Sequence, residues 1–293
     1  MTVPALDTRP RTAIFLMLAS SALIAVTTLL AKALGLGAAA GEAGLHPLQV
    51  SAGRFFFAFL AISTASLVLK PGLKSDNWAL HVGRSLSGWV GVSCMFAAAA
   101  RMPLADATAI SFLSPVVTML LAVVLLQERV GVRRWGAVAL ALIGALVLIR
   151  PGTESFRPAA LIALGAALAM GLEAILIKRL SDREPVARIL LINNGIGATV
   201  ACTAAMFVWS WPTPSQWGML AVLGLTMLCA QVCFVNAMRR GEASYVIPAF
   251  YSTLIFATLY DFVVFGDAPA WIAVAGAAMI VAGVLSLLRA ERH

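Results

Sequence analysis

Hydrophobic residues fall into long runs along this chain, and short polar turns separate one run from the next. An α-helix needs about 20 mostly apolar residues to cross a bilayer. Ten runs approach this length, at 13–34, 48–69, 80–100, 104–126, 133–150, 158–178, 186–210, 214–238, 244–266 and 270–289. The pattern predicts an all-α integral membrane protein with ten transmembrane helices.

An internal repeat relates the two ends of the chain. The stretch from Cys94 to Arg150 returns in altered form 139 positions later, so that Glu128 aligns with Asp267. In both copies an apolar helix ends in a basic turn, a second ends in a carboxylate, and a third, rich in small residues, ends in arginine. The first and sixth runs align at a spacing of 146 residues. We therefore expect two related domains, at 1–150 and 151–293.

Composition agrees with a membrane protein. Of the 293 residues, 61% are hydrophobic and 12% are charged, and the mean hydropathy is +0.94. Soluble proteins carry about 25% charged residues, so a soluble fold is excluded. The net charge of +8 does not indicate nucleic-acid binding, because the basic residues lie in short turns, as membrane topology determinants do.

The distribution of lysine and arginine predicts the orientation, since these residues accumulate on the cytoplasmic side. Fifteen belong to one set of termini and turns: Arg9, Arg11, Lys70, Lys74, Arg129, Arg133, Arg134, Lys178, Arg179, Arg183, Arg188, Arg239, Arg240, Arg289 and Arg292. Three belong to the opposite set: Arg101, Arg150 and Arg157. Both termini are therefore expected in the cytoplasm. Five helices per domain is an odd number, so the domains are expected to form inverted-topology repeats, an architecture that lets one site alternate between two faces.

A few polar residues interrupt the apolar helices and are candidates for a binding site. They are Arg54 in the second run, Glu173 in the sixth, and Asn193 and Asn194 in the seventh. Polar groups at membrane depth usually face the protein interior or water. Arg54 is either a structural ion-pair member or a bidentate anchor for a substrate carboxylate. Glu173 is a proton carrier, a partner for a cation or a structural acceptor.

Aromatic and hydroxyl side chains surround prolines in the fourth and ninth runs, which are repeat partners. Proline removes a helix hydrogen bond, so Pro115 and Pro248 predict kinks. The residues that flank these prolines are Thr108, Ser111, Phe112, Tyr245 and Tyr251, and Trp89 lies at mid-depth in the third run. An aromatic cavity with hydroxyls would suit a small amphipathic solute. Ordinary core packing remains the alternative.

Other functional classes lack sequence support. The chain has no Walker A, HExxH or GxSxG motif, and its histidines are scattered, so we expect no enzyme, no cofactor and no metal. The four cysteines lie inside apolar runs and show no disulfide or zinc spacing. Small residues line the fifth and tenth runs, which we expect to pack within one chain that is a monomer or a weak dimer.

Several segments carry a resemblance to a known family. They are HPLQVSAGRFFFAFL at 46–60, DATAISFLSPVVTMLLAVVLLQERV at 106–130, GAVALALIGALVLI at 136–149 and VFGDAPAWIAVAGAAMIVAG at 264–283. Across essentially the whole chain the pattern resembles the drug/metabolite transporter superfamily, in its ten-helix branch built from two EamA domains. The chain departs from that pattern at Thr253-Leu254, where a proline often recurs, and at Asp267, where Glu is usual.

The resemblance implies gradient-driven or facilitated movement of small organic metabolites, frequently the export of amino acids. It also implies a central cavity lined by helices one to four and six to nine. We therefore expect a multi-pass exporter in the bacterial inner membrane whose partners are the lipid bilayer and a small-molecule substrate, with aromatic or bulky apolar amino acids favoured. Nucleosides, vitamins and cationic drugs are alternative substrates. A lipid-modifying membrane enzyme and a membrane subunit without transport are the alternative classes.

Overall fold

The structure is a computed structural model, and it describes residues 10–37, 43–72, 74–99, 101, 110–149, 159–265 and 271–290. Every regular element within this part of the chain is a helix. The α-helices are α1 (Pro10–Leu36), α2 (Pro47–Leu69), α3 (Trp78–Ala99), α5 (Ser114–Leu125), α6 (Val132–Ile149), α7 (Ala159–Ser181), α8 (Val186–Ala205), α9 (Pro214–Arg240), α10 (Ala243–Val246), α11 (Ser252–Phe265) and α12 (Trp271–Ala290). Two 3₁₀ helices, η2 (Met206–Val208) and η3 (Ile247–Tyr251), complete the order.

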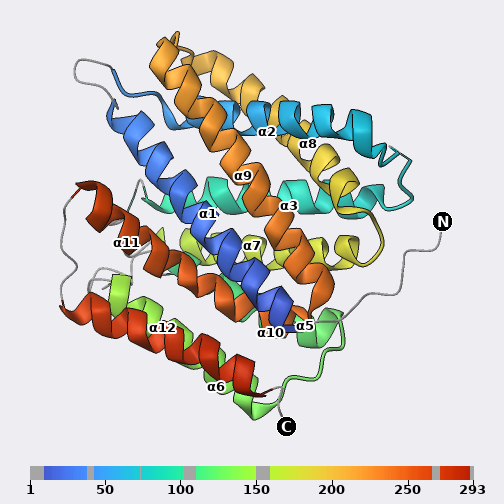
Figure 1. Cartoon of the computed structure of the whole chain (residues 1–293), viewed down its shortest axis with the longest axis vertical. Coiled ribbons are helices and arrows are strands. Elements are labelled where there is room, and N and C mark those ends of the chain that lie inside the picture. The colour runs from blue at the N-terminus through green and yellow to red at the C-terminus, as the bar shows by residue number, and fades with distance from the viewer. Residues whose placement is uncertain are drawn as a thin grey trace.

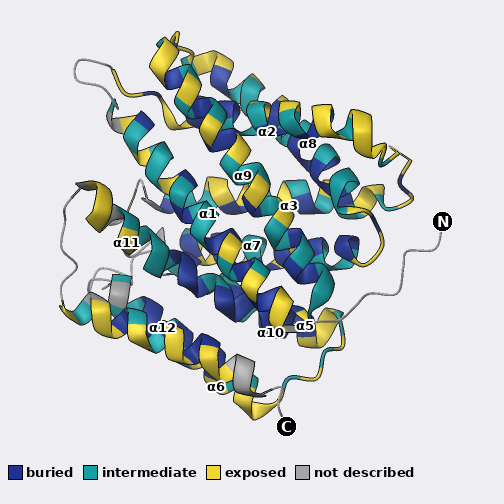
Figure 2. Cartoon of the chain, in the orientation of Figure 1, coloured by how far each residue is buried: buried dark blue, intermediate teal, exposed yellow. Residues whose placement is uncertain are grey.

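Among the described residues, six helical segments are long and apolar enough to cross a membrane: Arg11–Gly35, Pro47–Leu69, Ala160–Ser181, Val186–Val208, Pro214–Arg240 and Ala243–Val264. Ser114–Leu125 and Val274–Ser286 are shorter apolar helices. Large apolar side chains such as Leu67, Val68 and Val263 stand exposed on the helix surfaces, and Figure 2 shows this exposure along the outer sides of α2 and α12. Exposed apolar surface of this extent suits contact with lipid.

The helices pack in pairs that join distant parts of the sequence. Close pairs are α1 with α9, α3 with α7, α2 with α8, and α6 with α12. Figure 1 shows the α6–α12 pair at one end of the long axis and α2 with α8 at the other, with α1 and α9 side by side between them. Each pair takes one helix from residues 1–150 and one from the remainder, so the core is shared between the two parts of the chain.

Two helical segments are interrupted near their prolines. Pro115 lies in the first turn of α5, directly after a non-helical turn at Phe112 and Leu113. Pro248 lies inside η3, which separates α10 from α11. Proline is tolerated in a first helical turn because its missing N–H would have no helical partner there. The sequence predicted kinks at Pro115 and Pro248. The structure has a turn directly before α5, which contains Pro115, and a 3₁₀ helix around Pro248.

Glycines allow the backbones of α6 and α12 to pack closely against each other. A Cβ on Gly144 would lie 2.7 Å from the carbonyl oxygen of Gly276, and a Cβ on Gly283 would lie 2.9 Å from the carbonyl oxygen of Ala137. Gly144 and Gly283 are 139 residues apart, as are Ala137 and Gly276. The same backbone contact therefore occurs twice, with the helices exchanging roles, and the small residues of both helices pack within one chain.

A hydrogen-bond pair repeats at the same spacing. Gln49, in the first turn of α2, donates to the carbonyl oxygen of Ser210. Arg188, 139 residues after Gln49, donates from Nη2 to the carbonyl oxygen of Pro71 over 2.7 Å, and Pro71 precedes Ser210 by 139 residues. We call the end with the loops at 70–77, 126–131 and 182–185 the basic end, and the end with the 206–213 loop the opposite end. The two bonds tie the halves together at these two ends.

The Gly144 contact predicts a large effect from one methyl group. Gly144→Ala should lower the free energy of unfolding by about 1–3 kcal/mol, because the new Cβ meets backbone atoms that cannot rotate away. Thermal unfolding of the purified protein in detergent would measure the change. Gly136→Ala on the same helix is the matched control, since a Cβ there meets nothing within 4 Å; it should not lower stability and should raise it by up to about 1 kcal/mol, because alanine favours a helix more than glycine does. Equal stability of both variants would contradict the packing described for α6 and α12.

Candidate functional site

Three charged side chains come together within the apolar helices. Nε of Arg84, on α3, lies 4.0 Å from Oε1 of Glu173, on α7. The Glu173 carboxylate also interacts electrostatically with Arg54, on α2. We call Arg54, Arg84 and Glu173 the charged layer. Charges at membrane depth are costly unless they pair or contact water, so this layer is the first candidate for a transport site.

The members of the charged layer differ in how far the surrounding helices cover them. Arg84 is 3% exposed, while the Glu173 side chain is 29% exposed. Gly88, one turn after Arg84, creates the room for Glu173, because a Cβ on Gly88 would lie 2.9 Å from the carboxylate carbon. The guanidinium carbon of Arg54 lies 4.1 Å from the ring centroid of Phe55, a cation–π distance. Glu173 is therefore only partly covered by the protein, whereas Arg84 is almost fully covered.

Amide side chains extend the polar region along α8. Ser85, next to Arg84, lies with its Oγ 3.4 Å from Oδ1 of Asn193. Nδ2 of Asn194 donates to the carbonyl oxygen of Leu190 over 2.9 Å and to Oε1 of Gln231, on α9, over 2.8 Å. Oδ1 of Asn194 is buried with no hydrogen-bond partner among the described residues. Asn193 is thus joined to α3 of the charged layer, whereas Asn194 joins α8 to α9.

Phe112 and Tyr251 are in contact, as the expectation of an aromatic wall requires. Their ring centroids are 6.1 Å apart. Oη of Tyr251 donates to the carbonyl oxygen of Phe112 over 2.8 Å, and Tyr251 is fully buried. Because Phe112 lies in the turn before α5, this hydroxyl satisfies a carbonyl group near the helix interruption. The two residues are also separated by 139 positions, so the bond joins equivalent points of the two halves.

The other candidates from the sequence are more widely distributed. Trp89, on α3, is 56% exposed, and no described ring contact joins it to Phe112 or Tyr251. Ser111 is buried. Tyr245, in α10, is buried with its ring 5.6 Å from the guanidinium carbon of Arg134. Thr108 lies outside the described residues. The structure thus gives Arg54 an electrostatic interaction with Glu173 and brings Phe112 into contact with Tyr251, whereas Trp89 has no ring contact with that pair among the described residues.

Sequence reasoning did not identify Arg84 as a site residue. Arg84 lies near the start of the third apolar run, and nothing in the sequence separates it from the basic residues of the adjacent turn. The available signal was the small-residue face of α3, where Gly88 and Gly91 follow at helical spacing, because such a face predicts a close helix partner for Arg84. Within the part of the chain that the structure describes, no three His, Cys, Asp or Glu side chains form a metal site.

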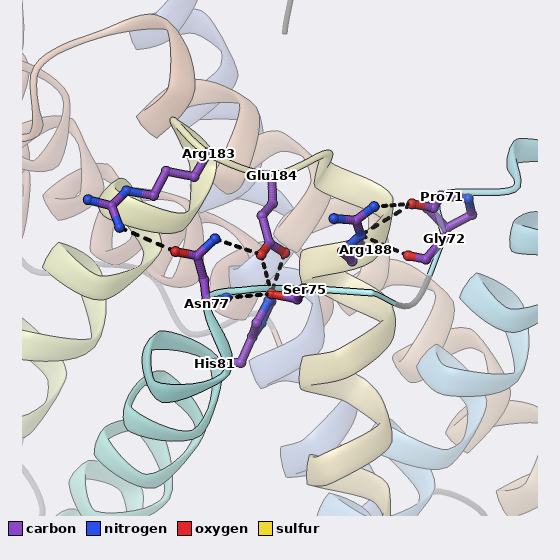
Figure 3. A network of polar contacts seen from close by, with 8 residues as sticks. All are labelled: Pro71, Gly72, Ser75, Asn77, His81, Arg183, Glu184 and Arg188. Atoms are coloured by element: carbon purple, nitrogen blue, oxygen red, sulfur yellow. Dashed lines mark hydrogen bonds and ion pairs between the residues drawn. The ribbon is translucent and has the colours of Figure 1, made fainter. Parts of the chain in front are cut away.

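A buried carboxylate holds the two halves together at the basic end (Figure 3). Glu184, between α7 and α8, accepts hydrogen bonds from Ser75 and from Nδ2 of Asn77, the latter over 3.0 Å, and its Oε2 lies 2.8 Å from Nε2 of His81. Nη1 of Arg183 donates to Oδ1 of Asn77 over 3.2 Å. Burial alone would raise the pKa of Glu184, but these hydrogen bonds and the nearby His81 hold that pKa below its usual value.

A second carboxylate joins the halves at the same end. Glu128, after α5, accepts the backbone N–H groups of Ala243 and Ser244 over 2.8 and 2.9 Å. These groups belong to the first turn of α10, whose helical N–H groups have no partner within that helix. Arg134 pairs with Glu242 beside them. Polar contacts at the basic end therefore cross between the halves at two separate places.

Comparison with known proteins decides the family. The sequence profile of the EamA-like transporter family matches residues 11–150 and again 157–289. The chain belongs to the EamA-like transporter family. This membership identifies a multi-pass membrane transporter of small molecules rather than an enzyme.

Relatives with named solutes cover most of this EamA-like transporter. An S-adenosylmethionine uptake transporter of Rickettsia prowazekii is 26% identical over 85% of this chain and 85% of its own length. A riboflavin transporter of Rhizobium johnstonii is 30% identical over 72% of this chain and 70% of its own. A pseudopaline exporter, CntI, of Pseudomonas aeruginosa is 25% identical over 71% and 74%. A solved crystal structure superposes with a TM-score of 0.82 at 20% identity, covering 96% of this chain and 99% of that one, which shows a shared fold.

Acidification should weaken the Glu184 contacts. Since the folded-state pKa of Glu184 is lowered, the carboxylate stabilises the folded protein above about pH 4.3, the ordinary value for glutamate. This contribution is lost as the pH falls through the lowered pKa. Glu184→Gln should therefore unfold at a lower temperature than the native protein near pH 7, and the difference should shrink towards about pH 3. Thermal unfolding across this pH range would measure it.

The exposed Glu242 offers a control for the acid response. Glu242→Gln removes a carboxylate that is half exposed and paired with Arg134, and such surface pairs contribute about 0–1 kcal/mol. Its unfolding temperature should follow that of the native protein at each pH. An unchanged difference between Glu184→Gln and the native protein at all pH values would show that the ionised form of Glu184 contributes nothing.

Proposed function

We propose that this protein is a secondary transporter that exports small organic metabolites, with aromatic and bulky apolar amino acids as favoured substrates. The observation that carries the proposal is the charged layer of Arg54, Arg84 and Glu173 inside helices that are otherwise apolar. A guanidinium can hold a substrate carboxylate with two parallel hydrogen bonds. The accessible Glu173 carboxylate can meet a positively charged group or carry a proton, which would couple transport to the proton gradient.

The mechanism that we propose is alternating access by ten transmembrane helices in two inverted five-helix domains, at 1–150 and 151–293. Support comes from two contacts that recur at a spacing of 139 residues with the halves exchanged, those of Gly144 and Gly283 and those of Gln49 and Arg188. The single bond from Tyr251 to Phe112 joins two positions at the same spacing. The double match of the family profile also supports it. Inverted repeats allow one half to rock against the other around a central site.

In the proposed orientation the basic end faces the bacterial cytoplasm together with both termini, and the protein lies in the inner membrane. The support is the excess of lysine and arginine at this end. The functional unit is proposed to be a single chain or a weak dimer, because the small-residue faces of α6 and α12 are used within one chain.

The proposed substrate contacts extend from the charged layer to neighbouring side chains. Arg54 would attract a carboxylate, and Asn193 and Asn194 would offer hydrogen bonds. Trp89 would supply an accessible ring for an apolar side chain, since it is more than half exposed. The remaining proposed contacts are Thr108, Ser111, Phe112, Tyr245 and Tyr251 around the helix interruptions at Pro115 and Pro248.

The relatives' solutes define the alternatives. S-adenosylmethionine contains an amino-acid head group and an aromatic base, whereas riboflavin is an aromatic vitamin. A site with guanidinium, carboxylate and amide groups fits the amino-acid head group of S-adenosylmethionine. We therefore rank amino acids and amino-acid derivatives above vitamins, nucleosides and cationic compounds as substrates.

Counterflow in liposomes that contain only the purified protein would test the proposed function. Liposomes would be preloaded with mixed amino acids, and labelled phenylalanine, tyrosine, leucine, S-adenosylmethionine, riboflavin and uridine would each be added outside. We expect accumulation of an amino acid or of S-adenosylmethionine. Arg54→Gln should lower the initial rate by about tenfold or more, as expected for the loss of one charged hydrogen bond.

Thr64→Ala is the matched control on α2, because Thr64 is exposed and bonds only to its own helix. It should leave the rate unchanged. Accumulation of riboflavin or uridine alone would overturn the amino-acid assignment. No accumulation of any of these solutes, with a folded protein, would refute the proposed function.

Tyr251 allows a separate test of the aromatic wall. Tyr251→Phe keeps the ring and removes the hydrogen bond to Phe112, so it should lower stability by about 1 kcal/mol and retain transport. Tyr251→Ala removes the ring and should also raise the KM for an aromatic substrate. If both variants show the same KM as the native protein, the Tyr251 ring does not contact the substrate.

A further inference from the structure

Arg84 is a buried guanidinium with unused donors. It is 3% exposed, and its Nε and Nη1 donate no hydrogen bond to any acceptor among the described residues. The distance of 4.0 Å from Nε to Oε1 of Glu173 is too long for a hydrogen bond. Burying a charged group without hydrogen-bond partners is strongly unfavourable. A protein that retains such a group in an apolar region gains from it in another state, such as one with a bound ligand.

The charge of the layer shows what kind of group the unused donors would bind. Arg54 and Arg84 both interact with one carboxylate, that of Glu173. Guanidinium groups keep their charge at neutral pH, so the layer carries an excess positive charge. A bound anionic group would balance that excess and supply acceptors for Nε and Nη1 of Arg84.

The packing of the helices does not require the charged pair. This step rests on the proposed repeat, in which α3 with α7 corresponds to α9 with α1. A Cβ on Gly91 would lie 3.6 Å from the carbonyl oxygen of Ala166, and the equivalent place in the other pair has the hydrogen bond from Ser20 to the carbonyl oxygen of Ala230. At the spacings of 139 and 146 residues, Arg84 corresponds to Leu223 and Glu173 to Thr27.

Leu223 and Thr27 are both buried, so the equivalent helix pair is packed without charge. An apolar residue and a hydroxyl are therefore sufficient for this architecture. Arg84 and Glu173 are present at only one of the two equivalent places. Their presence indicates a ligand contact rather than a requirement of the fold.

We propose that Arg84 binds the carboxylate of the transported solute, while Glu173 beside it receives a positively charged group of the same solute. The substrate class is then zwitterionic carboxylates with the head group of an α-amino acid. Arg84 and Glu173 are close enough to contact both charges of one such head group, yet they are not locked together by a hydrogen bond. The solute carboxylate can therefore compete with Glu173 for the guanidinium.

Three ligands that share a benzyl group test this assignment: phenylalanine, phenylalaninamide without the carboxylate, and 3-phenylpropionate without the ammonium. Their dissociation constants would be measured by thermal shift and by quenching of tryptophan fluorescence with the full-length protein. The native protein should bind phenylalanine at least about tenfold more tightly than phenylalaninamide. In Arg84→Gln this preference should fall by about tenfold to a hundredfold, the effect of losing a charged hydrogen bond.

Variants with a preserved fold keep the result interpretable. Arg84→Lys keeps the charge and should retain part of the preference. Arg84→Gln combined with Glu173→Gln leaves no unpaired carboxylate, so it should fold and bind the amide and the acid about equally. Arg183→Gln removes an exposed arginine at the basic end and should leave the preference as in the native protein. Glu173→Gln should reduce the preference for phenylalanine over 3-phenylpropionate.

Each outcome separates this inference from the proposed function. A preference for the carboxylate that persists in Arg84→Gln and in the double variant would overturn the role of Arg84, even if counterflow occurs. Failure of the native protein to bind either carboxylate would overturn it as well. A preference that depends on Arg84, without counterflow of any solute, would support the binding site and refute transport.

Discussion

Every polar group inside the apolar helices of this protein must find a partner within the protein, because hydrocarbon supplies no hydrogen bonds. Most of the described groups follow this constraint. The Tyr251 hydroxyl satisfies the Phe112 carbonyl beside a helix interruption, and Ser20 satisfies the carbonyl of Ala230 between α1 and α9. Arg84 departs from the rule with two buried, unused donors. Oδ1 of Asn194 also has no partner among the described residues. Arg84 differs from it because its buried group carries a charge, which is more costly to leave without hydrogen bonds, and because it lies beside the partly exposed Glu173.

Close helix packing forms the scaffold that holds the unpaired donors of Arg84. Gly144 and Gly283 allow α6 and α12 to approach to backbone contact, and Gly88 creates the space that the Glu173 carboxylate fills. The contacts of the α6–α12 pair recur with the halves exchanged, whereas the Arg84 contact does not. Recurrent contacts meet the needs of packing at both ends of the molecule. A contact that occurs once, at a cost in solvation, must be retained for another reason.

Hydropathy and local chemistry were sufficient to predict much of the fold. Runs of apolar residues predicted an all-helical membrane protein, and Pro115 and Pro248 lie where the structure has turns between helical segments. Arg54, Glu173 and Asn193 were chosen as site candidates because they interrupt apolar runs, and their role stays a prediction. The pairing of Arg84 with Glu173 could not be predicted, because it depends on which face of α3 meets α7, and helical periodicity does not specify the partner. The lack of a ring contact between Trp89 and the Phe112–Tyr251 pair could not be predicted from the sequence either. Both depend on how helices distant in sequence are rotated against each other.

The hydrogen bonds that join the two halves differ in strength between the two ends of the molecule. At the opposite end the halves are joined by neutral groups, with Gln49 bonded to Ser210 and Gln216 bonded to the carbonyl oxygen of Ala43. At the basic end the equivalent of Gln49 is Arg188, and Glu184 is buried among three polar partners. Both sets of contacts are present together, and the proposed alternating access requires one set to break each time the protein opens at that end. Hydrogen bonds to charged groups are about twice as strong as neutral ones, and breaking those to a buried carboxylate costs more. In the proposed cycle, opening of the basic end therefore requires the larger compensation, and a substrate that engages Arg84 and Glu173 near that end is suited to supply it.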